Sequence, residues 1–264
     1  MPYFPTSDGC SLYYEVQHPG ASKPVVVFVN GTAQTSVNWI QVSNLVKDRF
    51  QVLTYDCRAQ GRSGLGDREL TLELHAADLL ELIDSLGFSE VHPVGLSHGA
   101  GVALTFAYLY PQRVGRLVLC SATATLTSRS RPILKLWLET LSREGVEGMA
   151  QAALPAVFGS KFLMANSEVL DKIVQAIALR NHREGLAAHL RASMGYAPLN
   201  RMIPPARIPT LVLSGSDDRL APEEGARELA ELCGGEHRVL SGLGHSLPSE
   251  GPEPFARCLL DFLP

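Results

Sequence analysis

A serine held between two glycines is the first feature of this sequence whose residue types and spacing suggest chemistry. The segment Gly95-Leu96-Ser97-His98-Gly99 begins at the end of an apolar run, residues 91–96, and leads into a second one, residues 100–110. The pattern G-x-S-x-G is typical of a sharp turn from a strand into a helix, which projects the serine hydroxyl above a sheet. Glycine is needed on both sides because a β-carbon there would clash. The pattern therefore predicts Ser97 as a nucleophile, the alternative being an ordinary helix N-cap.

An acid and a base that could serve this serine follow later in the chain. A serine hydroxyl is a poor nucleophile unless a base removes its proton. Asp217 and Asp218 follow an apolar run at 211–213, and His245 follows a later short strand-like segment. Proteins with this serine turn carry the acid and then the histidine in that chain order. We therefore expect Ser97, His245 and one aspartate to meet at the carboxyl ends of the strands. Either aspartate could reach the imidazole.

Short apolar runs that alternate with helical stretches must position these residues. Five runs lack polar–apolar alternation, which is typical of strands buried on both faces of a parallel sheet. These runs are residues 25–29, 52–55, 91–96, 117–119 and 211–213. Residues 12–16 alternate more and predict an antiparallel edge strand. Apolar periodicity predicts helices at 72–86, 100–110, 223–232 and 254–262. The predicted fold class is α/β, with a mostly parallel central sheet flanked by helices.

Residues 123–205 interrupt this rhythm, because they contain helix-like segments without a strong strand signal. The segments are 133–143, 146–158, 169–180 and 184–194. About eighty residues are far more than one crossover between parallel strands needs, which argues against ordinary crossover helices. We predict that residues 1–122 and 206–264 form the core. Residues 123–205 are predicted to form a helical cap inserted over the carboxyl ends of the strands, where open α/β sheets bind ligands.

Composition excludes several classes of function. The 264 residues carry a net charge of −4 and are 45% hydrophobic, which is ordinary for one globular domain and provides no basic surface for nucleic acid. No apolar run is long enough to span a bilayer, and the first ten residues lack a signal-peptide pattern, so we expect a cytoplasmic location. The five cysteines are scattered without metal or redox spacing, as buried thiols in a reducing compartment would be.

The histidines other than His245 do not suggest a metal or a cofactor. His182 and His189 are seven residues apart, so one helix face could carry both. Two histidines without a third ligand nevertheless make a poor metal site. His75, on a predicted surface helix, and His92, near the start of a strand, are interpreted as structural. We expect no metal and no cofactor.

From residue 25 almost to its end, the chain resembles proteins of the α/β-hydrolase fold family, of the serine esterase and thioesterase type. The family pattern G-x-x-D-x-x-x-P falls on residues 215–222, and G-x-G-H falls on residues 242–245. The resemblance implies that Asp218 is the acid, and that Asp217 is a turn residue that caps the next helix. It also implies that the backbone amides of Thr32 and His98 form an oxyanion hole, the donors that stabilise a tetrahedral intermediate.

Two positions depart from the family's usual sequence. Most relatives have His-Gly where this chain has Asn30-Gly31. An Asn-Gly pair there is similar to bacterial acyltransferases that move 3-hydroxyacyl groups from acyl carrier protein. The family's D-x-R-G-x-G-x-S loop begins at Asp56, and Ala59 replaces its first glycine. Asp56 and Arg58 of this loop are interpreted as a structural pair.

The favoured function is hydrolysis of a small-molecule carboxylic ester or thioester through an acyl-serine intermediate. An acyltransferase that uses an acceptor other than water would need the same residues, and a catalytically silent binding protein is a third hypothesis. A serine nucleophile argues against epoxide hydrolase or haloalkane dehalogenase chemistry, because relatives with those activities carry aspartate there. Trp137, Phe158, Phe162 and Met194 are interpreted either as core of the cap or as the lining of an acyl pocket.

Overall fold

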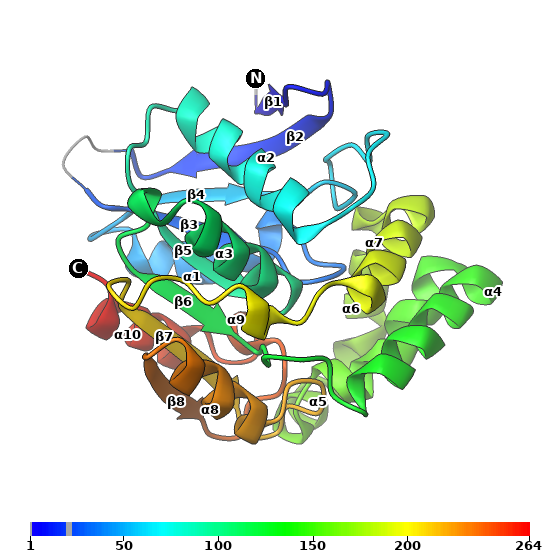
Figure 1. Ribbon diagram of the computed structural model, residues 1–264. Helices are drawn as coiled ribbons and strands as arrows, with labels where there is room; N and C mark the ends of the chain where they lie inside the picture. The colour runs from blue at the N-terminus through cyan, green and yellow to red at the C-terminus, as the bar shows by residue number, and fades with distance from the viewer. Residues whose placement is uncertain (1, 20–22) are drawn as a thin grey trace.

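The structure is a computed structural model and describes residues 2–19 and 23–264 (Figure 1). Within these ranges eight strands form one sheet, in the order β1-β2-β4-β3-β5-β6-β7-β8. The strands are β1 Tyr3–Pro5, β2 Ser11–Gln17, β3 Val25–Val29, β4 Gln51–Tyr55, β5 His92–Leu96, β6 Leu117–Cys120, β7 Thr210–Gly215 and β8 Glu236–Leu240. The pairs β1–β2 and β2–β4 are antiparallel, and all other pairs are parallel. The prediction of a mostly parallel sheet with an antiparallel edge is confirmed.

Helices cover both faces of the sheet because the central strands are apolar along their whole length. Val27 and Val29 of β3 belong to a core that includes residues of the helices at 72–85, 98–109 and 223–232. Val26 and Phe28 belong to the opposite core, with residues of the helices at 40–46 and 252–262. Side chains of a strand alternate between the two faces of a sheet, so a strand covered on both faces has no polar positions.

Four core helices confirm the sequence prediction to within a few residues at their ends. They are α2 Leu72–Ser85, α3 His98–Leu109, α8 Glu223–Leu232 and α10 Pro252–Phe262. Two shorter helices, α1 Ile40–Val46 and α9 Leu247–Glu250, were not predicted. Among all helices in the described ranges, none combines the length and the apolar composition needed to cross a membrane.

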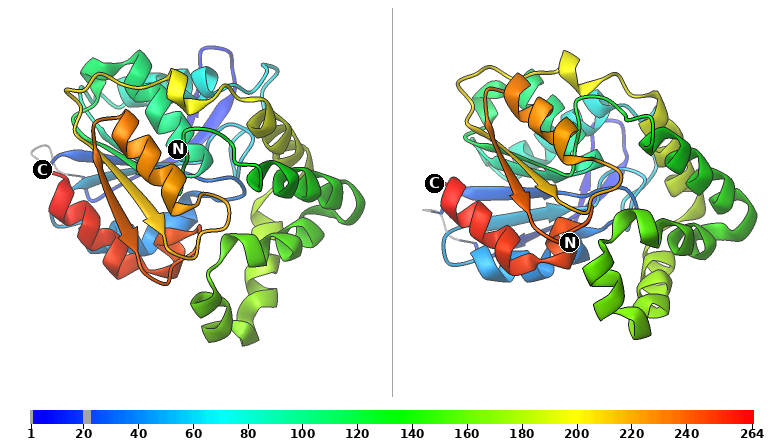
Figure 2. Two further views of the ribbon diagram at one scale, coloured as in Figure 1. Left: turned by 60° about the horizontal axis from the view of Figure 1, so that its bottom comes forward. Right: turned by 90° about the horizontal axis from the view of Figure 1, so that it is seen from below.

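Four further helices lie between β6 and β7 in the chain, and we call residues 123–205 the insertion. Its helices are α4 Ser130–Val157, α5 Ser160–Ala165, α6 Leu170–Arg180 and α7 Arg183–Gly195. Figures 1 and 2 show them gathered at one side of the sheet. The helices predicted at 133–143 and 146–158 are the two arms of α4, which is bent at Gly145 (φ 77°, ψ −168°). Glycine adopts this left-handed conformation without the steric cost that a β-carbon would add.

The insertion packs closely on the core. Trp137 and Leu186 of the insertion share a hydrophobic cluster with Leu220, which belongs to the loop after β7. At the start of α7, a β-carbon on Gly185 would lie 2.5 Å from the carbonyl oxygen of Ala59 in the loop after β4. The insertion is therefore in direct contact with two of the loops that follow the carboxyl ends of the strands.

Candidate active site

Ser97 lies in a strained turn between β5 and α3. Its backbone adopts φ 55° and ψ −114°, a conformation that residues with a side chain rarely adopt. A β-carbon on Gly95 would lie 2.1 Å from the carbonyl oxygen of Gly99, and one on Gly99 would lie 2.2 Å from that of Val29. Both glycines are therefore required, as the sequence predicted. Ser97 occupies the N-cap position of α3 without a side-chain capping hydrogen bond, so capping does not explain the serine.

Asp218 places its carboxylate against the imidazole of His245. The two carboxylate oxygens lie 2.9 and 3.0 Å from Nδ1 of the ring. The side chain of Asp218 is fully buried, and that of His245 is 10% exposed. The backbone amides of Leu220 and Ala221 donate to Oδ1 of Asp218 at 2.8 and 2.9 Å, which fixes the orientation of the carboxylate. An acid held in this way can in turn hold the imidazole in one orientation and one tautomer.

Asp217 has a different partner. Its Oδ2 accepts a hydrogen bond from the amide of Ser160, the first residue of α5, at 2.6 Å. This hydrogen bond lowers the pKa of Asp217. The sequence interpretation had Asp217 capping the next helix of the core, but it caps a helix of the insertion. Of the two adjacent acids, Asp218 contacts His245 and Asp217 attaches the insertion to the loop after β7.

Main-chain hydrogen bonds hold His245 from two directions. Oγ of Ser121, which follows β6, donates to the carbonyl oxygen of His245 at 2.8 Å. The amide of His245 donates to the carbonyl oxygen of Val157, the last residue of α4, at 2.8 Å. His245 is therefore tied to the sheet on one side and to the insertion on the other.

Glu250 organises the loop that carries His245 and was not identified from the sequence. Its Oε2 accepts hydrogen bonds from the amides of Gly159 and Gly244 at 2.9 and 2.8 Å, and its Oε1 accepts one from Ser246 at 3.0 Å. Burial raises the pKa of this carboxyl, while the three amides act in the opposite direction. Since both carboxylate oxygens accept hydrogen bonds from backbone amides, Glu250 acts as a positioning residue for the loop that carries His245. No sequence pattern distinguishes it from the other acids near it.

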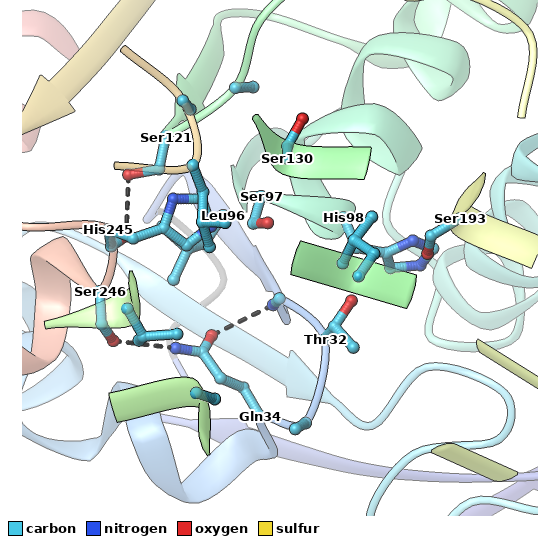
Figure 3. Close-up of a pocket in the computed structure, with 18 of the residues that line it drawn as sticks. Thr32, Gln34, Leu96, Ser97, His98, Ser121, Ser130, Ser193, His245 and Ser246 are labelled. Carbon is cyan, nitrogen blue, oxygen red and sulfur yellow. Dashed lines mark hydrogen bonds between the residues drawn. The ribbon is translucent and has the colours of Figure 1, made fainter. Parts of the chain in front are cut away.

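Two residues predicted for the oxyanion hole, Thr32 and His98, line the same cavity as Ser97 (Figure 3). Within the part of the chain that the structure describes, neither amide donates to a protein acceptor. His98 is the first residue of α3, where the helix dipole favours a negative charge. Two unoccupied donors beside a serine hydroxyl are what a developing oxyanion requires.

Gln34 supports the loop that carries Thr32 and was also missed from the sequence. Its Oε1 accepts a hydrogen bond from the amide of Gly31, and its Nε2 donates to Oγ of Ser246, both at 3.1 Å. Figure 3 shows Gln34 reaching across the floor of the cavity between these two loops. Gln34 therefore connects the loop after β3 with the loop that carries the histidine.

Asn30 is fully buried and supports packing, and its side chain does not line the cavity. Its Nδ2 donates to the carbonyl oxygen of Tyr55 at 2.9 Å, and its Oδ1 accepts from Nε1 of Trp39 at 2.8 Å. The likeness to 3-hydroxyacyl transferases depended on Asn30 and its neighbouring glycine. Because this side chain joins β3 to its neighbours inside the core, it carries no information about an acyl acceptor.

Asp56 and Arg58 are structural, but the predicted pairing between them is wrong. Asp56 accepts a hydrogen bond from the amide of Ser36 at 2.7 Å. Arg58 donates to both carboxylate oxygens of Asp78 at 2.7 and 2.9 Å and forms a second ion pair with Asp8. A guanidinium has enough donors for two carboxylates, which explains why Arg58 does not need Asp56.

A cavity of about 560 Å³ lies between the core and the insertion, above the serine turn. Trp137, Phe158 and Phe162 line it, but Met194 does not, and its neighbour Ser193 does. Adjacent residues of a helix point about 100° apart, so α7 turns Ser193 toward the cavity and Met194 away from it. Trp137 and Phe158 also pack in hydrophobic clusters of the insertion, so the two sequence interpretations, core and lining, both hold for them.

The structure places His75, His182 and His189 differently from the sequence interpretation. His182 is exposed at the N-cap of α7, whereas His189 is fully buried, so one helix face does not carry both. His75, expected on a surface helix, is only 1% exposed. Its ring centroid lies 4.9 Å from that of His98 and 5.5 Å from that of His189. The rings of His75, His98 and His189 therefore form one buried group next to the cavity.

Comparison with known proteins identifies the family to which the chain is similar. A model of the alpha/beta hydrolase fold family matches residues 24–252. The chain is 31% identical to RutD of Yersinia enterocolitica, provisionally named a carbamate hydrolase, over 96% of this chain and 92% of that protein. It is 29% identical to a 2-hydroxy-6-oxononadienedioate/2-hydroxy-6-oxononatrienedioate hydrolase of Paraburkholderia phymatum, over 97% and 92% of the two chains. The crystal structure of the enol-lactonase from Burkholderia xenovorans superposes with a TM-score of 0.88, at 27% identity and 99% coverage of both chains.

Proposed function

Because the chain belongs to the alpha/beta hydrolase fold family, we propose that it cleaves a carboxylic ester or thioester through an acyl-serine intermediate on Ser97. The observation that carries the proposal is the contact between the carboxylate of Asp218 and Nδ1 of His245, beside the strained serine turn. The comparisons support hydrolysis in general. An enol-lactone, the substrate named for one structural neighbour, is a cyclic ester.

In the proposed mechanism, His245 accepts the proton of the Ser97 hydroxyl through Nε2 while the serine oxygen attacks the carbonyl carbon. Asp218 keeps the proton on Nδ1 and stabilises the imidazolium. The amides of Thr32 and His98 donate to the oxyanion, a contribution for which the loss of one donor typically costs about 10²–10³ in kcat. His245 then protonates the leaving group, and the same residues activate the water that releases the acid.

The alternative of acyl transfer uses the same residues up to the acyl-enzyme and differs only in the acceptor. No feature of the described residues favours it, because Asn30, on which that resemblance depended, is buried away from the cavity. A silent binding protein would not need a strained serine, a buried acid against the histidine and two unoccupied amides together. We therefore treat both alternatives as outcomes of the experiment that follows.

The test is release of p-nitrophenol from acyl esters of increasing chain length by the wild-type protein and by Ser97→Ala. We expect steady turnover in the wild type and its loss in the variant. A single burst without turnover would indicate an acyl-enzyme that waits for another acceptor. Absence of both burst and turnover, in folded protein that also resists a fluorophosphonate label, would refute the role of Ser97.

The lining of the cavity further suggests that the substrate carries an anionic group. Arg131 of α4 and Arg180 at the end of α6 line the otherwise largely apolar cavity. Among the described residues, neither forms an ion pair with an acid. A guanidinium binds a carboxylate with two parallel hydrogen bonds, which would orient such a substrate. The dienedioate named for the hydrolase relative also carries carboxylates.

This part of the proposal is tested with two esters of equal length, one neutral and one ending in a carboxylate. We expect the double variant Arg131→Gln/Arg180→Gln to raise KM for the anionic ester about tenfold and to leave the neutral ester within about twofold. Arg191→Gln is the control, because Arg191 is exposed on α7 and does not line this cavity. Equal effects of the double variant on both esters would show that the arginines do not bind the anion.

A further inference from the structure

A group of buried side chains of metal-ligating types includes the ring of His98, and the proposed mechanism uses none of these side chains. Sγ of Cys57 and a ring nitrogen of each of His75 and His98 lie within 4.8 Å of one another. The three residues come from the loop after β4, from α2 and from α3, and are 0%, 1% and 8% exposed. The ring of His189 of α7 packs against the group, since its centroid lies 4.1 Å from that of His98.

The ring nitrogens of this group lack protein partners. In the described ranges, neither Nδ1 nor Nε2 of His75, His98 and His189 forms a hydrogen bond. Buried polar atoms without partners are unfavourable, because they have lost their hydrogen bonds with water. A neutral imidazole has a free lone pair on one ring nitrogen, which is the form that binds a metal ion.

We propose that Cys57, His75 and His98 bind one divalent ion of the Zn²⁺ class, with His189 as the nearest candidate for a fourth ligand. Thiolate and imidazole together are the donor set that Zn²⁺ prefers. Tetrahedral coordination at bond lengths of about 2.0–2.3 Å requires donor atoms about 3.4 Å apart, so each side chain must move inward by less than about 1 Å. Such a shift is within the reach of rotamer adjustments, since the ring nitrogens of His75 and His98 have no hydrogen-bond partner among the described residues.

Binding is balanced in protons and in charge. The S–H bond of Cys57 breaks, a sulfur–metal bond forms, the proton passes to solvent, and no atom is oxidised or reduced. The ion and one thiolate leave a single positive charge. The carboxylates of Asp56 and Asp78 act on the Cys57 sulfur from nearby, and Asp78 and Asp8 together exceed the charge of Arg58 by one. The Arg58 charge also acts on the ring of His75, so the two aspartates that pair with Arg58 are needed to offset it.

The site would connect three segments immediately beside the proposed oxyanion hole. His98 follows the nucleophile, so an ion on its ring would fix the residue whose amide borders the reacting carbonyl. His98 also lines the cavity, so the group lies directly beside it. The inference does not depend on the proposed function, because metal binding is measured without substrate.

The experiment uses the full chain, stripped of metal with a chelator and then titrated with Zn²⁺ in competition with an indicator, and with Co²⁺ as a spectroscopic substitute. We expect one ion per chain, bound with a Kd below about 1 µM, and a near-ultraviolet thiolate-to-cobalt band. Cys57→Ser should remove that band, and Cys57→Ser and His75→Gln should each weaken binding at least about 100-fold. The controls are Cys120→Ser, equally buried on the other face of the sheet, and His182→Gln, exposed on α7.

The proposal is overturned if the wild type binds no Zn²⁺ at about 100 µM, a concentration at which a three-ligand site would be saturated. It is equally overturned if the ligand variants bind as tightly as the two controls. Should the variants fail to fold, X-ray absorption of the zinc-loaded wild type provides the answer. A sulfur scatterer at about 2.3 Å together with imidazole nitrogens supports the site, and a shell without sulfur refutes it.

Discussion

Replacing Asp218 by asparagine removes the charge that faces His245 while keeping the shape of the side chain. Oδ1 of Asp218 accepts hydrogen bonds from two backbone amides, and Oδ2 lies 2.9 Å from Nδ1 of His245. In Asp218→Asn the carbonyl oxygen must stay with the amides, so the NH₂ group occupies the Oδ2 position. It would then donate to Nδ1, which forces the ring proton onto Nε2. An imidazole in that tautomer cannot accept the proton of Ser97.

The expected loss of kcat is large because His245, in the wrong tautomer, can no longer act as the base. The same exchange in a serine–histidine–aspartate triad typically lowers kcat about 10⁴-fold, which corresponds to about 5–6 kcal/mol of activation free energy. Folding should change much less, since the two amide hydrogen bonds to the side chain are kept. KM should stay within about threefold, because the side chain of Asp218 is fully buried behind His245.

The assay is steady-state ester hydrolysis by Asp218→Asn, with Asp217→Asn as the matched control. Asp217 is the adjacent residue and contacts Ser160 of α5, so the control changes the same charge in the same loop. We expect kcat of the control to stay within about threefold of wild type. Equal losses in both variants, or a normal rate in folded Asp218→Asn, would refute the assignment of the acid.

Two further predictions concern stability. His92 is buried and its Nδ1 accepts a hydrogen bond from the amide of Arg116 at 3.0 Å; burial and the Arg116 charge lower its pKa from 6.5 to about 4. The unfolded chain therefore binds the proton more readily than the folded protein. The free energy of unfolding should fall by about 2–3 kcal/mol through His92 as pH falls from 7 to 4.5. In denaturant titrations His92→Asn, which keeps a hydrogen-bond acceptor, should flatten this part of the pH dependence. Gly185→Ala should lower the free energy of unfolding by about 1–3 kcal/mol, because its β-carbon meets the Ala59 carbonyl oxygen at 2.5 Å. Gly195→Ala, at the other end of α7, is the control, because its added β-carbon has no neighbour within 4 Å. It should be neutral or stabilise the protein by up to about 1 kcal/mol. A Gly185→Ala protein as stable as this control would contradict the close packing of α7.

Sequence periodicity predicted most of the helices of the insertion but not their contacts with the core. The two arms of α4 and the helices α6 and α7 were predicted from the sequence, whereas the short helix α5 was not. The bend at Gly145 separates the two arms of α4 close to where the pattern breaks. The replacement of a family glycine by Ala59 also has a local meaning, since Ala59 adopts φ 68° and keeps the left-handed conformation despite its β-carbon. Periodicity did not reveal that Gly185 brings α7 against that loop, because this contact depends on how two distant segments meet.

Residues that act through long-range contacts were invisible to the sequence. Glu250 and Gln34 hold the loops of the candidate site through backbone amides and a serine hydroxyl, and such partners have no fixed spacing along the chain. His75 looked like a surface residue because the apolar stripe of its helix was judged without knowing what covers the other face. The insertion covers that face and buries His75 against His189 of α7.

The sequence by itself determined the serine turn and the class of fold, because glycine requirements and apolar periodicity are properties of neighbouring residues. It also named Asp218 by pattern, but left Asp217 within reach of the same ring. Only the tertiary structure separated the two acids, by giving Asp217 an amide of α5 and Asp218 the imidazole of His245. The buried group of Cys57 and three histidines likewise exists only in the folded chain, since its members come from four segments that packing alone brings together.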